Sequence, residues 1–391
     1  MLADIAHVGR SPHSGGYRRF AWTPEDALLR EWFAGEAARR SMDVHVDRAG
    51  NQWAWWGCPD TEGPGVVLGS HLDSVPDGGA FDGPLGVVSA FATIDALRAA
   101  AIIPARPVGV VAFSDEEGAR FGVACAGSRL LTGSLPTERG LALTDGEGIS
   151  MAEAMAKAGL EPTDVARDDE TLRRIGVFLE LHVEQGRALA ELGRPVAVGS
   201  SIMPHGRWRL DILGTADHAG TTRLQDRDDP MLAFAAGVVA ARAAAERAGC
   251  VATIGKVLVE PNGVNAIPSR VTAWLDARGA DEVAVRGVVA AVEAASGAEA
   301  EEESWSPASR FEPVLVGRMA ALLGGAPVLR SGAGHDAGVL ATAGIPAAML
   351  FVRNPTGISH SPAEHAEEAD CRAGIDALTR TVAVFAHDHA G

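Results

Sequence analysis

Histidines and carboxylates recur at the ends of apolar runs in this 391-residue chain. Four segments (GSHLDSV, SDEEG, LHVEQG and GISHS) each present a potential metal ligand just after an apolar run, and the glycine-rich loop GGAFDGPLG adds one more carboxylate. The side chains with this chemistry are His71, Asp73, Asp82, Glu116, Glu117, His182, Glu184 and His360. A set of imidazoles and carboxylates without thiolates suits Zn²⁺, Mn²⁺, Co²⁺ or Ni²⁺ better than Ca²⁺ or Mg²⁺.

One carboxylate shared between two such metals would make a bimetal centre. A metal pair lowers the pKa of a bridging water and polarises a carbonyl, which is the chemistry of hydrolysis. A nearby carboxylate that binds no metal can then take and deliver the proton. The adjacent Glu116 and Glu117 offer one side chain for each of these roles.

The apolar runs that precede these residues predict the strands that position them. Val66–Leu68, Val108–Phe113, 176–183 and Ala347–Val352 are short apolar runs typical of buried strands. Helical patterns over 23–40, 84–100 and most of 127–160 alternate with them. We therefore predict an α/β fold with a mixed sheet and helices on both faces. In such sheets, sites form beyond the carboxyl ends of the strands, so the polar segments should converge on one edge.

The middle of the chain has a different order of elements. Strand and helix patterns follow one another as β-α-β-β-α-β, over 208–213, 230–248, 251–259, 270–277, 281–296 and 299–306. This order is typical of a ferredoxin-like module. The sequence thus predicts a discontinuous catalytic domain, 1–202 with 316–391, and an inserted domain over 203–315.

Composition excludes several classes of function. The chain has 34 Lys and Arg against 51 Asp and Glu, a net charge of −17. Broad binding to nucleic acid or to an anionic membrane needs the opposite sign of charge. No apolar stretch approaches the roughly 18 residues of a membrane span, and MLADIAHVGR is no secretory signal. With four widely spaced cysteines and no CxxC pair, we expect a reducing, cytoplasmic location.

Six motifs resemble those of one enzyme family. They are GSHLDSVPDGGAFDGPLGV (69–87), SDEEGARFG (114–122), LHVEQG (181–186), ADHAGTT (216–222), NAIPSR (265–270) and GISHSP (357–362). Together they resemble the M20-type metallohydrolases, and most closely the branch of N-carbamoyl-L-amino-acid amidohydrolases, allantoate amidohydrolases and β-alanine synthase. The resemblance extends from Gly50-Asn51 to the HSPAE run at 360–364, nearly the whole chain.

The resemblance implies a metal centre with two divalent ions per subunit. His71 and His182 would hold the first ion, Asp82 would bridge both, and Glu117 with His360 would complete the second. Glu116 would act as general base and then general acid. Asp73 is the expected partner that orients the His71 ring.

The resemblance also implies a substrate site. His218, Asn265 and Arg278 match family positions that polarise the scissile carbonyl and grip polar groups of the substrate, and a guanidinium binds a carboxylate through two parallel hydrogen bonds. Gln185 would lie near the substrate, and His335 would be another active-site histidine. In the family the inserted domain closes as a lid and forms the homodimer. Whether His218 and Asn265 serve their own subunit or its partner stays open.

The expected activity is cleavage of a carbamoyl or related amide C–N bond in a small carboxylate, such as an N-carbamoyl-L-amino acid or allantoate. The alternatives are an aminoacylase or dipeptidase of the same superfamily and a non-catalytic metal-binding regulatory protein. Arg353, before the last ligand, is a further candidate for substrate binding. The sequence leaves the metal, the exact substrate and the role of Trp53, Trp55 and Trp56 open.

Overall fold

The computed structural model describes residues 1–387 and divides the chain into two compact units. Of the described residues, the larger unit contains 1–201 and 310–387, and the smaller contains 202–309. The second junction lies at 309, earlier than the expected 315, because strand β13 (Ser309–Arg310) joins the sheet of the larger unit. No helix among the described residues has the length and apolar character needed to cross a bilayer.

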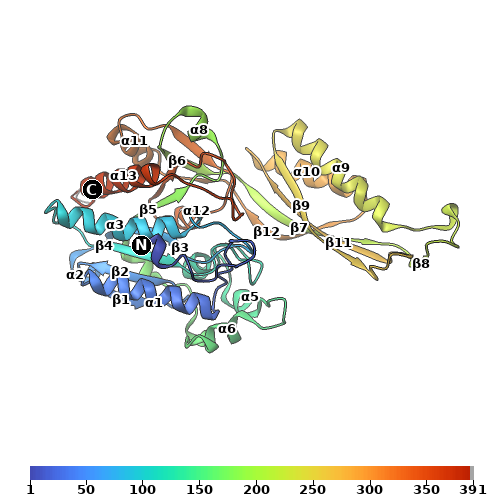
Figure 1. Ribbon diagram of the computed structural model, residues 1–391, viewed down its shortest axis with the longest axis horizontal. Coiled ribbons are helices and arrows are strands. Elements are labelled where there is room, and N and C mark those ends of the chain that lie inside the picture. Colours follow the sequence, from blue (N-terminus) through green and yellow to red (C-terminus); the bar gives the residue numbers. More distant parts are fainter. Residues whose placement is uncertain (388–391) are drawn as a thin grey trace. The chain divides into compact units, whose positions relative to one another are not determined.

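The larger unit is built on a nine-stranded mixed sheet (Figure 1). The strands are, in sheet order, β1 (Asp43–Val46), β2 (Gln52–Trp56), β4 (Val108–Phe113), β3 (Gly65–His71), β5 (Ile175–Val183), β15 (Ala347–Val352), β6 (Val196–Ile202) and β13, with β14 (Val328–Ser331) paired to β6. The central β4, β3, β5 and β15 are mutually parallel, while β1, β2 and β6 pair antiparallel. The predicted mixed α/β fold is confirmed.

Helices cover both faces of this sheet, as adjacent residues of β5 demonstrate. Leu181 faces α13 (Glu368–Phe385). A Cβ added at Gly374 of this helix would lie 3.0 Å from Cδ1 of Leu181. The neighbouring Glu180 accepts the backbone N–H of Ala337 in α12 (Asp336–Thr342) at 3.1 Å. Successive strand residues point to opposite faces, so α13 and α12 lie on opposite sides. Helix α3 (Pro84–Ala99) packs beside α13.

The remaining helices of the larger unit are shorter or peripheral. They are α1 (Pro24–Arg39), α2 (Pro59–Glu62), α4 (Ala126–Thr132), α5 (Thr137–Ala142), α6 (Met151–Lys157), α7 (Asp169–Arg173), α8 (Ala188–Leu192) and α11 (Pro313–Leu322). Helix α1 begins as its sequence predicts, since Thr23 caps the N–H of Asp26 and proline occupies the first turn. The mostly helical stretch predicted over 127–160 is three short helices.

The hairpin β1–β2 is an element that sequence patterns did not predict. Its turn is organised by Asp47, a buried carboxylate that accepts two backbone N–H groups, the Asn51 amide and the Trp53 indole N–H. The Trp53 ring is fully buried, stacks on Trp55 and meets Phe113 edge to face. These contacts give Trp53 and Trp55 a structural role.

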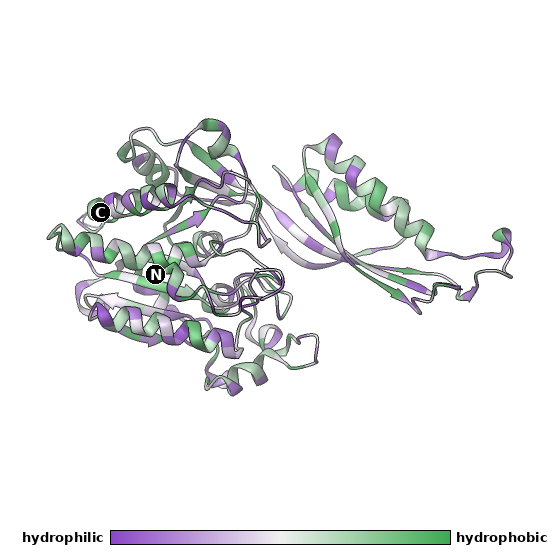
Figure 2. Ribbon diagram, viewed as in Figure 1, coloured by the Kyte–Doolittle hydropathy of each residue, from purple (hydrophilic) through white to green (hydrophobic). Residues whose placement is uncertain are grey.

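The smaller unit has the predicted β-α-β-β-α-β order. Its four strands form one antiparallel sheet in the order β12 (Ala300–Ser306), β7 (His205–Leu213), β11 (Arg270–Arg278) and β9 (Val251–Glu260). Helices α9 (Pro230–Ala248) and α10 (Glu282–Ser296) cover one face over a core that includes Trp208, Leu275 and Val288. Helix α9 is apolar along most of its length (Figure 2). Strands β8 (Asp217–His218) and β10 (Ala266–Ile267) pair as a separate ribbon.

Candidate metal centre

The four central parallel strands bring the predicted ligands to one edge of the large sheet. His71 is the last residue of β3, and His182 lies one residue before the end of β5. Glu117 follows β4, and His360 follows β15. Two groups of side chains meet there with ligand atoms within 4.8 Å of one another: His71, Asp82 and His182 in one, and Asp82, Glu117 and His360 in the other.

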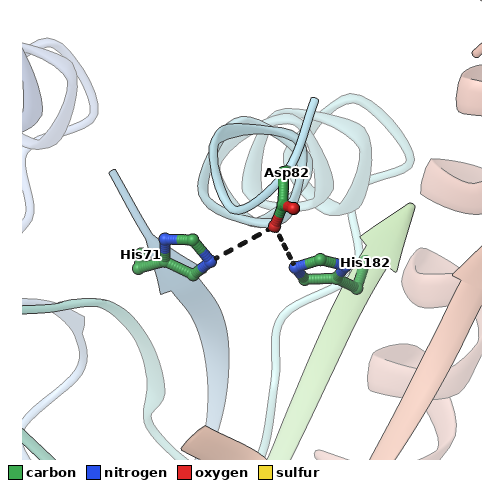
Figure 3. A group of neighbouring side chains, drawn as sticks. All are labelled: His71, Asp82 and His182. Carbon is green, nitrogen blue, oxygen red and sulfur yellow. Dashed lines mark ion pairs between the residues drawn. The ribbon is translucent and has the colours of Figure 1, made fainter. Parts of the chain in front are cut away.

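Asp82 belongs to both groups and directs one carboxylate oxygen toward each. Its Oδ1 lies 3.7 Å from Nε2 of His71 and 3.2 Å from Nε2 of His182 (Figure 3). Its Oδ2 lies 3.5 Å from Nε2 of His360, which in turn is 3.5 Å from Oε1 of Glu117. A carboxylate placed between two ligand groups in this way can bridge two ions.

Backbone contacts prepare the two buried histidines to bind a metal. Nδ1 of His71 lies 3.1 Å from the Asp73 carbonyl oxygen, and Nδ1 of His182 lies 2.9 Å from that of Val183. A carbonyl only accepts, so Nδ1 carries a proton in each ring, and in the neutral form of the ring the lone pair is on Nε2. Both Nε2 atoms face Asp82, and the buried Nε2 of His182 has no hydrogen-bond partner among the described residues. A divalent cation would satisfy it.

Asp73 holds the segment that carries both glutamates. Its Oδ1 accepts the backbone N–H of Glu116 at 3.1 Å, and its Oδ2 accepts that of Glu117 at 3.0 Å. The same residue contacts His71 mainly through its carbonyl, because Oδ1 is 3.5 Å from Nδ1. Asp73 thus positions the two glutamates as well as the histidine.

Glu116 lies beside the first group of ligands. Its Oε2 is 3.8 Å from Nε2 of His71, and its Oε1 accepts the thiol of Cys125 at 3.3 Å. Burial raises the pKa of Glu116 well above its usual range. A carboxylate with a raised pKa beside a metal group is suited to move a proton at neutral pH.

The electrostatics of the cluster favour a bound cation. Burial, followed by the charge of Asp82, raises the pKa of Glu117 to about 8. Burial also raises the pKa of Asp336, 0% exposed, to about 8. Burial away from water makes the charged forms of these carboxylates unfavourable. A bound divalent ion would stabilise the charged forms and so remove this cost. The donor set of imidazoles and carboxylates therefore fits a divalent metal.

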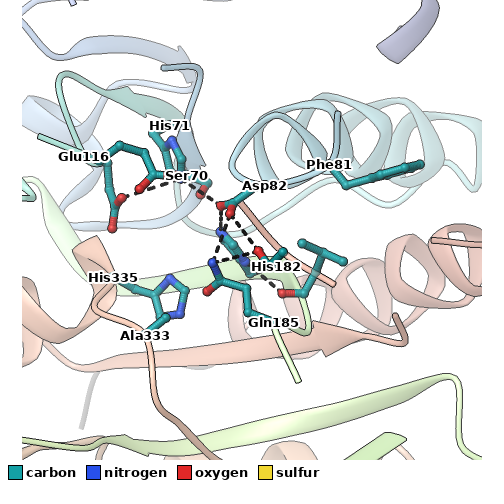
Figure 4. Close-up of polar contacts among 12 residues, drawn as sticks. Ser70, His71, Phe81, Asp82, Glu116, His182, Gln185, Ala333 and His335 are labelled. Atoms are coloured by element: carbon teal, nitrogen blue, oxygen red, sulfur yellow. Dashed lines mark hydrogen bonds and ion pairs between the residues drawn. The ribbon is translucent and has the colours of Figure 1, made fainter. Parts of the chain in front are cut away.

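Two of the predicted substrate residues of this unit surround the ligands (Figure 4). Nε2 of Gln185 donates to Oδ2 of Asp82 at 2.9 Å and to the Ser359 hydroxyl at 3.2 Å. The ring of His335 lies 4.6 Å from that of His182, and its Nε2 is 3.0 Å from the Ser331 hydroxyl. Both residues thus lie beside the candidate ligands.

Arg353 is bound elsewhere. Its Nε and Nη2 donate to the two oxygens of Asp370 at 2.8 and 2.9 Å. Asp370 is buried near the start of α13, so this bidentate pair ties the end of β15 to that helix. The guanidinium is satisfied by protein groups, which is a structural role for Arg353.

His218 and Asn265 lie together in the smaller unit. His218 is in β8, opposite Ala266 of β10, and the backbone N–H of Ala219 donates to the Asn265 carbonyl at 3.0 Å. Nδ1 of His218 accepts the N–H groups of Gly220 and Thr221 at 3.0 and 3.2 Å. The ring proton is therefore on Nε2, which leaves the exposed histidine with an N–H to donate.

Arg278 lies at the other end of the same unit. It is the last residue of β11, where its guanidinium donates to both oxygens of Asp276 at 2.7 and 2.9 Å. Strand β11 spans nine residues from Arg270, which directly follows the loop after β10. At about 3.3 Å per residue, Arg278 lies roughly 26 Å along the strand from that ribbon. The smaller unit thus separates Arg278 from His218 and Asn265.

The structure adds buried polar residues that sequence reasoning missed. Glu180 lies two residues before His182 on the same face of β5, accepts the Ser70 hydroxyl at 2.7 Å, and forms a further possible ligand group with His182 and His335. The alternating polar positions of ELH in an otherwise apolar strand were the available signal. Glu364 and Cys125 gave no such signal, because their partners lie in other segments.

Comparison with known proteins matches residues 67–384 to the model of peptidase family M20/M25/M40. The chain is 37% identical to the N-carbamoyl-L-amino acid amidohydrolase of Geobacillus stearothermophilus, over 97% of this chain and 96% of that one. It is 31% identical to the allantoate amidohydrolase of Escherichia coli, over 96% and 94%.

Among solved structures, the fold is similar to that of AtUAH in complex with glyoxylate. The TM-score is 0.89 at 27% sequence identity, with 99% of this chain and 96% of that chain covered. The family match spans most of the chain, and the fold agrees over nearly all of it. With its paired His and carboxylate groups at the carboxyl edge of a mixed sheet, this chain belongs to the M20/M25/M40 family of hydrolases.

Proposed function

We propose that this protein is a binuclear metal-dependent amidohydrolase that cleaves the carbamoyl or ureido C–N bond of a small carboxylate. The observation that carries the proposal is Asp82, whose two oxygens face two separate ligand groups, His71 with His182 and Glu117 with His360. Two divalent ions, Zn²⁺ or one of Mn²⁺, Co²⁺ and Ni²⁺, suit these donors. When bound, such ions supply Lewis acidity to the hydrolytic water and to the scissile carbonyl.

The residues of the chain divide the remaining chemistry. Glu116 takes a proton from the attacking water and returns it to the leaving amine, a role supported by its buried position 3.8 Å from His71. His218 donates its Nε2–H to the oxygen of the scissile carbonyl as negative charge develops there. Gln185 and Asp73 hold the ligands in place, through Asp82 and through the glutamate segment.

The proposed substrate class rests on the relatives. Two of the relatives are named for hydrolysis of an N-carbamoyl-L-amino acid and of allantoate, and the related AtUAH structure holds glyoxylate. All three compounds carry a carboxylate, and two of them a carbamoyl or ureido group. Arg278 is the residue that we assign to the substrate carboxylate, with Asn265 and His335 as further contacts. Arg278 is also paired with a carboxylate, that of the partly exposed Asp276. Arg353 is left out of the site because, unlike Arg278, it matches no substrate-binding position of the family and its partner Asp370 is buried.

The separation within the smaller unit supports a homodimer in which the subunits share sites. Because β11 holds Arg278 roughly 26 Å from the ribbon that carries His218 and Asn265, one copy of this unit cannot bring all three to one small substrate. We assign His218 and Asn265 to the site of the partner subunit. The smaller unit would act as both lid and dimerisation domain.

An exposed apolar surface on that unit supports the same assembly. Strand β9 is the edge strand of its sheet, with Val251 and Leu258 more than half exposed. Helix α9 exposes Leu232 and Val239, at 73% and 69%. Unpaired strand edges and contiguous apolar residues favour association with another chain. Four free cysteines agree with a reducing, cytoplasmic location.

One experiment tests the activity directly. Ammonia release is measured over N-carbamoyl-amino acids, allantoate and other ureido acids, with N-acyl amino acids and dipeptides as controls and each of the four metals supplied in turn. Glu116→Gln is assayed beside the wild type, with its bound metal measured. We expect turnover of ureido acids to fall at least 100-fold in Glu116→Gln while two ions stay bound. Turnover of N-acyl substrates alone would contradict the proposed substrate class, and retained activity in the variant would contradict the assigned base.

A further inference from the structure

Glu364 is a buried carboxylate that binds the backbone beside Asp82. Its Oε2 accepts the N–H of Phe81 at 2.9 Å and the N–H of Asp82 at 3.0 Å. The two segments are 282 residues apart in sequence. Glu364 is only 6% exposed, although an ionised carboxylate is costly to bury without such partners. It belongs to neither ligand group that contains Asp82.

A second connection runs from Glu364 to the side chain of Asp82. The hydroxyl of Ser359 lies 3.2 Å from Oδ2 of Asp82 and 3.3 Å from Oε1 of Glu364. Oε2 of Glu364 thus holds the backbone at Asp82. Its Oε1 lies next to the Ser359 hydroxyl, and this hydroxyl contacts the carboxylate of Asp82. Together these contacts leave the Asp82 carboxylate little freedom to turn.

The loop before Asp82 is shaped to receive Glu364. A Cβ added at Gly79 would lie 2.1 Å from Oε2 of Glu364 and 2.5 Å from its Cβ. Any side chain at this position would push the carboxylate away from the two N–H groups. A glycine is therefore required here by the close approach of Glu364.

We propose that Glu364 is a positioning residue that holds Asp82 in the orientation needed to bridge two metal ions. The inference rests on the proposed function, in which Asp82 is the bridging ligand. Outer partners that orient a ligand change metal affinity by about 10- to 100-fold when removed, and we expect an effect of this size. A glutamine at position 364 keeps an oxygen that can accept both N–H groups and so should preserve most of the affinity.

The test measures binding of Mn²⁺ to the full-length protein by the electron paramagnetic resonance of the free ion. Glu364→Ala should weaken the affinity about 10- to 100-fold, and Glu364→Gln should lie within about threefold of the wild type. Gly79→Ala should weaken it similarly while Glu364 itself is unchanged, which keeps the test valid if Glu364→Ala fails to fold. Glu367→Ala is the matched control, because that exposed carboxylate lies on the same segment and pairs, among the residues that the structure describes, with His365 and not with the Asp82 loop.

The outcomes separate this inference from the proposed function. Wild-type affinity in Glu364→Ala or in Gly79→Ala, measured beside a loss of metal in Asp82→Ala, would overturn the inference alone. An equal loss in Glu364→Gln and Glu364→Ala would also overturn it, because charge and not position would then be responsible. Wild-type affinity in Asp82→Ala would instead overturn the proposed centre and, with it, the role on which the inference rests.

Discussion

Trp53→Phe should reduce the free energy of unfolding by about 2.5–4 kcal/mol at pH 8. The indole N–H donates to Oδ2 of the buried Asp47 at 2.9 Å, and phenylalanine removes this donor. A hydrogen bond to a charged group contributes about 1.5–3 kcal/mol. The smaller ring leaves a space in a fully buried site, which adds roughly 1 kcal/mol.

The pH dependence of this effect follows from the pKa of Asp47. Burial raises that pKa from 3.8 to about 6 in the folded protein. Because the folded state binds this proton more tightly than the unfolded state, the wild type gains stability as the pH falls through 6 toward 4. Below pH 6 the carboxyl is neutral and its hydrogen bond with Trp53 is weaker. The loss caused by Trp53→Phe should therefore shrink to about 1–2 kcal/mol at pH 5.

Urea unfolding followed by far-ultraviolet circular dichroism, at pH 8 and pH 5, measures both values. Trp56→Phe is the control, since Trp56 lies on the other face of β2, with the guanidinium of Arg98 4.7 Å from its ring. The free energy of unfolding of Trp56→Phe should fall by less than about 1 kcal/mol, and by the same amount at both pH values. A loss in Trp53→Phe below about 0.5 kcal/mol, or one that does not change with pH, would refute the role given to Asp47.

Three further predictions concern the metal centre and its surroundings. Asp73→Asn leaves one acceptor for two backbone N–H groups, so the affinity for Mn²⁺ should fall about 10-fold or more; an unchanged affinity would contradict its positioning role. Arg353→Ala removes the guanidinium that pairs with the buried Asp370, so the free energy of unfolding, measured by chemical denaturation, should fall by about 1–3 kcal/mol while KM stays unchanged. A raised KM without a loss of stability would instead indicate that Arg353 binds the substrate. Burial and Asp82 raise the pKa of Glu117 to about 8, and neighbouring carboxylates also raise the pKa values of His71 and His182, so Mn²⁺ must displace at least one proton at pH 6. The affinity for Mn²⁺ should therefore rise at least tenfold per pH unit from pH 6 to 8, and a flat profile would contradict this.

The side chains of the two candidate ligand groups could be singled out from the sequence because their signal is local. His71 and His182 end strongly apolar strands, and Val108–Phe113 and Ala347–Val352 are strands with the predicted bounds. An apolar run followed at once by a histidine or carboxylate is visible without any knowledge of tertiary structure. The parallel pairing of these strands then brings separate segments to one edge.

The rest depends on contacts between distant segments, which no local pattern encodes. In the sequence, Arg353 stands seven residues before His360 with no evident partner. Its pairing with Asp370, 17 residues further along the chain, becomes visible only in the fold. Strand β1 is short, alternates polar residues with valine and is mostly exposed, so it gives no apolar run. Glu364 lies in the HSPAE run, yet the backbone N–H that its carboxylate accepts belongs to Asp82, 282 residues away in sequence.

The order in which the ligands leave the ribosome is a consequence of where they lie in the chain. Asp82, Glu117 and His182 are synthesised first, the whole of the smaller unit follows, and His360 and Glu364 come near the end. The second ligand group and the support for Asp82 therefore cannot form before the segment with His360 and Glu364 has been synthesised. Loading of both proposed metals requires the chain up to residue 364, and a chain that stops before residue 360 would carry the carboxylates Asp82 and Glu117 without the ligand that completes their group.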